Sequence, residues 1–109
     1  MKQFDIMWAN LPGPIGRRPV VLLTRTPAYT YLNKVLIAEV TSTVRGIPQE
    51  VSVGSHEGLS KASVINFDNI HVIPKTSLVK QIGSIRPERQ REVKRALGYV
   101  LDWAELKVL

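Results

Sequence analysis

Hydrophobic and polar residues alternate over much of residues 3–85, and this alternation predicts a series of short β-strands. In residues 3–9, Phe4, Ile6 and Trp8 share one side of an extended chain, with polar or smaller residues between them. That is the pattern of a half-buried strand. Later segments are short, rich in leucine or β-branched residues, and bounded by turn residues, which also favours strands. We therefore expect strands at residues 3–9, 19–24, 35–41, 49–53, 63–67, 70–73 and 78–85.

The segments between these strands are rich in turn-forming residues. A loop is expected at residues 10–17, a polar and aromatic connection at 27–33, and a turn at Gly46–Pro48, because proline, glycine and asparagine favour turns. Asp68–Asn69 is expected to separate the two strands that flank it.

The periodicity changes at Pro87, where we expect a helix to begin. Proline is favoured at the first helical position, and Glu88 suits the positive end of the helix dipole. The apolar residues that follow have helical spacing, and the other face is basic. The expected packed face consists of Val93, Ala96, Leu97, Val100, Leu101 and Ala104. The pattern predicts a mainly β protein with helices (α+β): one domain over residues 1–109, a small curved barrel with a C-terminal amphipathic helix.

Composition adds a basic charge to this picture. The 109 residues are 44% hydrophobic and 22% charged, as in an ordinary globular domain, and carry a net charge of +6. This charge favours an anionic partner, but it does not distinguish nucleic acid from an anionic membrane or an acidic protein. The chain has no cysteine, which excludes disulfides and thiolate metal sites. Because no apolar run approaches about 18 residues, we expect a cytoplasmic protein without a membrane span.

Three segments, in order, cover nearly the whole chain and resemble the MazF/PemK/Kid family of toxins. They are IMWANLPGPIGRRPVVLLT (6–24), VLIAEVTST (35–43) and LSKASVINFDNIHVIPKTSLVKQIGSI (59–85). The first is similar to the family's opening strand, loop and "RPVLV" strand, and the second to its strand that ends in threonine. The resemblance implies an SH3-like barrel, shared with the gyrase poison CcdB, and a homodimer. It also implies cleavage of single-stranded RNA without a metal or cofactor, leaving a 2′,3′-cyclic phosphate and a 5′-hydroxyl, and inhibition by a cognate antitoxin with an acidic tail.

Such cleavage needs a base for the 2′-hydroxyl, stabilisation of the phosphorane charge and an acid for the leaving oxygen. Arg18 occupies the family's catalytic arginine position, and its planar guanidinium can hold two phosphate oxygens. Thr41 matches the functional threonine, and Ser42 is expected to share phosphate binding. Both residues also have a purely structural interpretation. Arg18 is then an ordinary arginine at the end of a strand, and Thr41 is a threonine that favours an exposed strand face. Arg17 is expected on the RNA backbone track.

The general base is where the sequence departs from the family pattern. Many relatives carry an acidic residue in a longer loop, whereas GPIG here leads directly to Arg17. Asp68 becomes the candidate base, since NFDN is similar to a segment with a functional aspartate in the Kid branch, or it is a turn-forming aspartate. Asn66, Asn69 and His71 are expected to contact RNA, and His71 also suits proton transfer.

Two rival interpretations stay open at this point. A CcdB-like protein that traps a topoisomerase, or a small barrel that binds RNA without cutting it, has the same fold, and fold does not decide function. A housekeeping basic barrel explains the charge but not the order of the motifs. No metal site is expected, because neither His56 nor His71 has a second ligand at suitable spacing.

Overall fold

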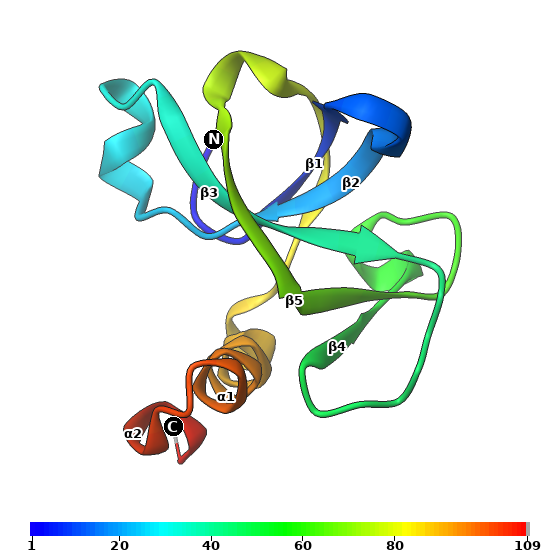
Figure 1. Cartoon of the computed structure of the whole chain (residues 1–109), viewed down its shortest axis with the longest axis vertical. Coiled ribbons are helices and arrows are strands. Elements are labelled where there is room, and N and C mark those ends of the chain that lie inside the picture. The colour runs from blue at the N-terminus through cyan, green and yellow to red at the C-terminus, as the bar shows by residue number, and fades with distance from the viewer. Residues whose placement is uncertain (109) are drawn as a thin grey trace.

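The computed structural model describes residues 1–108 and contains one antiparallel sheet of six strands in the order β4-β5-β3-β2-β1-β6. The sheet curls strongly, and the helices lie against one end of it (Figure 1). The strands are β1 (Asp5–Leu11), β2 (Gly16–Leu22), β3 (Lys34–Thr41), β4 (Glu50–Val53), β5 (Ser63–Pro74) and β6 (Leu78–Ser84). The α-helices are α1 (Gln90–Val100) and α2 (Ala104–Lys107). The 3-10 helices are η1 (Gly13–Ile15), η2 (Thr26–Thr30), η3 (Ser55–Glu57), η4 (Lys75–Ser77) and η5 (Pro87–Arg89).

The predicted strands are confirmed in place, but the loop at residues 10–17 is wrong in extent. β1 and β2 continue pairing to Leu11 and Gly16, and only Pro12 and the short helix η1 separate them. Gly16 has φ +65°, a conformation that glycine adopts without a steric penalty. The segment is therefore a tight hairpin that brings Arg17 and Arg18 directly into β2.

The predicted break at Asp68–Asn69 is also wrong in kind. β5 runs through it as one strand, and the pairing with β3 shifts there, from Asn66 opposite Glu39 to Ile70 opposite Ala38. Three residues of β5 are thus accommodated in a bulge, which bends a strand without ending it. The polar pair marks the correct position but not the correct structure.

The sheet buries both of its faces. The first hydrophobic cluster includes Ile6, Val40, Ile65 and Phe67 and receives α1, and the second includes Val20, Leu22, Ile37 and Ile73. The curl brings β6 against η3, where a Cβ on Gly83 would collide with the backbone of Glu57. This contact closes the side of the half-barrel that no strand pairing closes.

The C-terminal helix is shorter than its pattern predicts. The 3-10 helix η5 begins at Pro87, and α1 begins only at Gln90. On the predicted packed face Val93 and Ala96 are buried and Leu97 and Val100 pack against the first cluster. Leu101 and Ala104 are exposed, which corrects that part of the prediction.

The chain turns at Asp102, whose φ is +50°, and α2 then folds back on α1. This turn ends the helical periodicity, so residues beyond it cannot share the face of α1. No helix among residues 1–108 is long and apolar enough to cross a membrane.

Candidate active site

A cleft opens where β2 and β3 separate. The two strands pair only through Val20–Leu22 and Ile37–Glu39, so the start of β2 and the end of β3 diverge. The resulting hollow has a volume of about 450 Å³. We call it the β2/β3 cleft, lined by Trp8, Arg17, Arg18, Pro19, Val40, Thr41, Ser42, Gly58, Leu59, Ser60, Lys61, Ser63 and Ile82.

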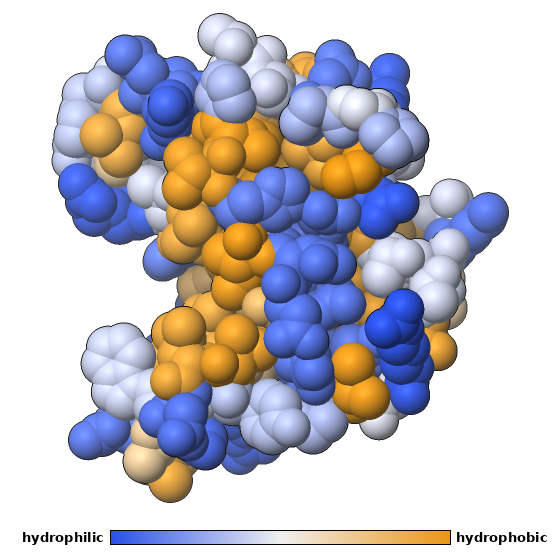
Figure 2. Space-filling view, in the orientation of Figure 1, coloured by the Kyte–Doolittle hydropathy of each residue, from blue (hydrophilic) through white to orange (hydrophobic). Residues whose placement is uncertain are grey.

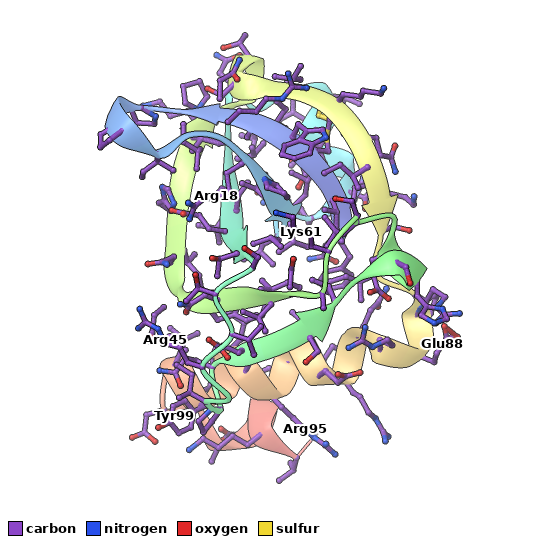
Figure 3. All side chains as sticks on the ribbon, turned by 90° about the vertical axis from the view of Figure 1, so that its right-hand side faces the viewer. Arg18, Arg45, Lys61, Glu88, Arg95 and Tyr99 are labelled. Carbon is purple, nitrogen blue, oxygen red and sulfur yellow. The ribbon has the colours of Figure 1, made fainter. Side chains whose placement is uncertain are left out.

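The cleft combines positive charge with hydroxyl groups. Arg17, Arg18 and Lys61 line it, and no acidic side chain is among the described residues of its wall. Arg18 and Lys61 lie on the open side that faces the viewer in Figure 3. Such a surface attracts an anion, because cations around a concave surface reinforce one another's potential.

Arg18 is held by a buried carboxylate. Its Nη1 donates to Oε1 of Glu39 at 3.1 Å, and Glu39 is only 7% exposed. The other oxygen of the same carboxylate, Oε2, lies 2.6 Å from Nε2 of His71. Glu39 therefore bridges a residue of β2 and a residue of β5.

Strand geometry explains why these three side chains meet. Directly opposed residues of an antiparallel pair share a face, as do residues two apart in one strand. Val20 opposes Glu39, and His71 opposes Ile37. Arg18, Glu39 and His71 thus project from the sheet face that carries the second hydrophobic cluster.

The hydroxyl groups lie at the end of β3. Thr41 is half-buried and its Oγ1 accepts a hydrogen bond from the backbone N–H of Thr43 at 3.1 Å. This contact orients the side chain and leaves its hydroxyl hydrogen to donate. Ser42 is exposed beside it, and both line the β2/β3 cleft.

Arg17 and Trp8 form a stacked pair at the cleft. The guanidinium carbon of Arg17 lies 5.3 Å from the ring centroid of Trp8, within the range of a cation–π contact. Trp8 is half-buried, as the alternating pattern of its strand predicts, and its ring lines the cleft.

The remaining predicted residues lie on the bulge of β5. Oδ2 of Asp68 accepts a hydrogen bond from Nε2 of Gln49 at 2.6 Å, and the Asp68 backbone N–H donates to Oδ1 of Asn66 at 2.9 Å. Asp68 and Asn69 are exposed. Neither belongs to the described wall of the β2/β3 cleft, although Asn66 directly opposes Glu39.

Glu39 is the site residue that the sequence reasoning missed. It is the one acidic residue within VLIAEVT, between Ala38 and Val40, which are both buried. An acidic residue inside an apolar run was the available signal, because a carboxylate is rarely buried unless it is paired. Elsewhere in the described chain, no three His, Cys, Asp or Glu side chains group as metal ligands.

Comparison with known proteins gives the arrangement its context. A sequence model of the PemK-like, MazF-like toxins of type II toxin–antitoxin systems matches residues 2–101. The chain belongs to this toxin family. The toxin is 39% identical to the endoribonuclease MazF3 of Mycobacterium tuberculosis over 88 residues, which are 79% of this chain and 85% of the relative. It is 34% identical to the probable endoribonuclease MazF2 of the same species, over 89% of this chain and 94% of the relative.

Solved structures agree with the fold of the toxin. The M. tuberculosis toxin MazF-mt6 superimposes with a TM-score of 0.85 at 36% identity, over 90% of this chain and 96% of that one. A mycobacterial endoribonuclease in complex with its cognate antitoxin superimposes with a TM-score of 0.82 at 23% identity, over 94% and 96% of the two chains. The predicted MazF-type barrel with a C-terminal helix is therefore confirmed.

Proposed function

We propose that this toxin cuts single-stranded RNA in the β2/β3 cleft by metal-independent transesterification, giving 2′,3′-cyclic phosphate and 5′-hydroxyl ends. As a member of this family, with relatives named endoribonucleases over most of its length, the chain is an endoribonuclease toxin. The observation that carries the proposed chemistry is the convergence of Arg18 with Thr41 at one basic cleft.

Arg18 is the group that stabilises the reacting phosphate. Only Glu39, among the described residues, hydrogen-bonds to its side chain, through Nη1. The remaining N–H groups of the guanidinium are available to the non-bridging oxygens, whose charge grows as the phosphorane forms. The fixed Nη1 contact reduces the reorganisation that this step requires.

Thr41 and Ser42 supply neutral hydrogen bonds to the same phosphate, which fix its position. Arg17 and Lys61 extend the positive wall along the RNA backbone, and the exposed guanidinium of Arg17, supported by the Trp8 ring, offers a planar surface on which a base stacks. Asn66, Asp68 and Asn69 present amide and carboxylate groups on the bulge that suit base edges.

The test of this function is incubation of a long single-stranded RNA with the purified protein in excess chelator. We expect discrete fragments with 2′,3′-cyclic phosphate ends, because the mechanism uses the 2′-oxygen of the substrate. Arg18→Ala should lower kcat by about 10²- to 10³-fold, as removal of one charge-stabilising donor does. RNA that stays intact with micromolar wild-type protein would instead favour a toxin that binds without cutting.

The proposed partners are a cognate antitoxin with an acidic segment and a second copy of the toxin. The family description supports an antitoxin, and the net charge of +6 suits an acidic segment of it. Hydrophobic side chains gather on one face over the strands and towards the helices (Figure 2). Leu36 and Val72 oppose each other across β3 and β5 and are 39% and 58% exposed, and Trp103 is 53% exposed.

Exposed apolar side chains of this kind suit a homodimer interface. Light scattering at micromolar concentration checks it, and a mass near the 12.2 kDa of one chain would contradict the dimer. We place the proposed activity in the cytoplasm, where cellular RNA is translated.

A further inference from the structure

A buried carboxylate in the middle of an apolar strand needs an explanation. Glu39 lies between Ala38 and Val40, and its side chain is 9% exposed. Burial of an ion pair is often no better for stability than apolar residues of similar volume, because desolvation cancels much of the attraction. Stability alone therefore gives little reason for a glutamate at this position.

The two partners of Glu39 have a different environment. The side chains of Arg18 and His71 are 35% and 36% exposed, so each is fixed at one end and open at the other. Neither Glu39 nor His71 belongs to the described wall of the β2/β3 cleft, but Arg18 does, and the two oxygens of one carboxylate connect the His71 ring to that arginine. Thr41, two residues beyond Glu39 in β3, projects from the same face and adds its hydroxyl.

The contact with Glu39 also determines which nitrogen of His71 is available. The ionised carboxylate only accepts hydrogen bonds, so Nε2 of His71 carries the proton that is shared with Oε2. In the neutral imidazole the other nitrogen, Nδ1, is then unprotonated. No described residue hydrogen-bonds to Nδ1. His71 thus presents a free basic nitrogen in a fixed orientation.

We propose that His71 is the general base of the RNA cleavage and that Glu39 is the residue that positions both His71 and Arg18. The proposal rests on the RNA cleavage proposed above and assigns its missing base. Nδ1 of His71 takes the proton of the 2′-hydroxyl, and the 2′-oxygen forms a bond to phosphorus. The bond from phosphorus to the 5′-oxygen breaks, and that oxygen leaves with the electron pair and takes a proton from water. His71 then returns its proton to solvent.

This assignment separates His71 from the alternative base, Asp68. The carboxylate of Asp68 is engaged by Gln49, and its described contacts include none with Arg18. A base must lie within hydrogen-bond distance of the proton that it abstracts. Of the two candidate bases, only His71 is connected to Arg18, because both bind the carboxylate of Glu39.

The test compares matched amide variants of the purified full chain on one RNA substrate with a mapped cleavage site. His71→Gln should lower kcat by about 10²- to 10⁴-fold with little change in KM. The Kd of His71→Gln for the same RNA with a 2′-deoxy sugar at the cleaved position should stay within about threefold of the wild-type Kd.

Glu39→Gln provides the second arm. The new amide donates to Nε2 of His71 and moves the ring proton to Nδ1, which removes the base without removing the histidine. We therefore expect a loss of similar size. The double variant should be little worse than either single variant, because both disable one unit. The controls are His56→Gln and Glu88→Gln, at exposed positions outside the site, with activity expected within about twofold of wild type.

The outcomes are distinct. Cleavage by wild type together with a His71→Gln kcat within threefold of the wild-type value would overturn the role of His71 and leave the RNA cleavage intact. A large loss in Asp68→Asn with none in His71→Gln would move the base to Asp68. No cleavage by wild type would overturn both proposals. If Glu39→Gln fails to fold, the half-exposed His71→Gln still decides the assignment.

Discussion

Removal of the Arg89 side chain should destabilise the toxin strongly. Arg89 donates from Nη1 to Oε2 of Glu57 at 3.2 Å and from Nη2 to the backbone oxygen of Ser52 at 2.6 Å. It also pairs with Glu92 at 2.8 Å. The guanidinium therefore ties the start of the C-terminal helix to β4 and η3, beside the wall of the cleft at Gly58.

The magnitude follows from the burial of Glu57. Its side chain is 2% exposed, and in Arg89→Ala its carboxylate keeps only the backbone N–H of Gly54 among its described partners. Breaking a buried pair in this way costs about 3–5 kcal/mol. The contact with Glu92, whose side chain is 42% exposed, adds only about 0–1 kcal/mol. Because the free energy of unfolding of a domain is typically about 5–15 kcal/mol, this loss is a large share of the stability.

Urea unfolding and thermal unfolding at pH 7, both followed by circular dichroism, measure this loss. We expect Arg89→Ala to lower Tm by roughly 10–20 °C. Arg86→Ala is the matched control: its ion pair with Glu88 is 3.4 Å long, with side chains 54% and 68% exposed, and its loss should cost about 0–0.5 kcal/mol. Adding Glu57→Gln to Arg89→Ala should restore part of the stability, because a neutral amide is cheaper to bury. A loss below about 1 kcal/mol in Arg89→Ala would refute the reasoning.

Two further predictions concern stability. Gly83→Ala should lower the free energy of unfolding by several kcal/mol, because its Cβ would collide with the backbone of Glu57. Gly54→Ala should cost far less, because the atom nearest to its Cβ is 3.9 Å away. Calorimetry on both variants compares them, and equal Tm values would contradict the close packing at Gly83. The Arg89 guanidinium lowers the pKa of Glu92, so their pairing stabilises the fold above the ordinary glutamate pKa of about 4.3 and this contribution is lost as pH falls through the lowered value. The stability difference between wild type and Glu92→Gln should therefore shrink from pH 6 to pH 3, and a constant difference would show that the pair is not electrostatic.

The sequence predicted the elements of this fold well because most of them follow local periodicity. The run PVVLLT and the run VLIAEVT are buried central strands, and the spacing of Val93 and Ala96 identified the packed face of the helix. The predictions failed where a reversal of the chain interrupts a pattern. The exposed position of Leu101 depends on the turn at Asp102, and periodicity carries no information about such a turn.

The candidate site was predicted only in part, because local sequence patterns do not show which residues of distant strands meet. Arg18 and Thr41 were found because each ends or begins a recognisable segment, and the structure brings them to one cleft. Glu39 was missed because its role depends on partners 21 and 32 residues away in sequence, contributed by two other strands. A single sequence does not give the register that places those partners opposite one another.

The same register explains how one strand supplies both core and site. Ile65, before the bulge of β5, and Phe67, its first residue, point into the first hydrophobic cluster, and Ile73, after the bulge, points into the second. All three are odd-numbered, so a regular strand would place them on one face. The bulge accommodates an odd number of extra residues, from Asn66 opposite Glu39 to Ile70 opposite Ala38, and this exchanges the two faces. His71 consequently projects beside Glu39 rather than into the first cluster. The irregular segment of β5 is therefore what places an imidazole next to the buried carboxylate, and a regular strand of the same composition would not.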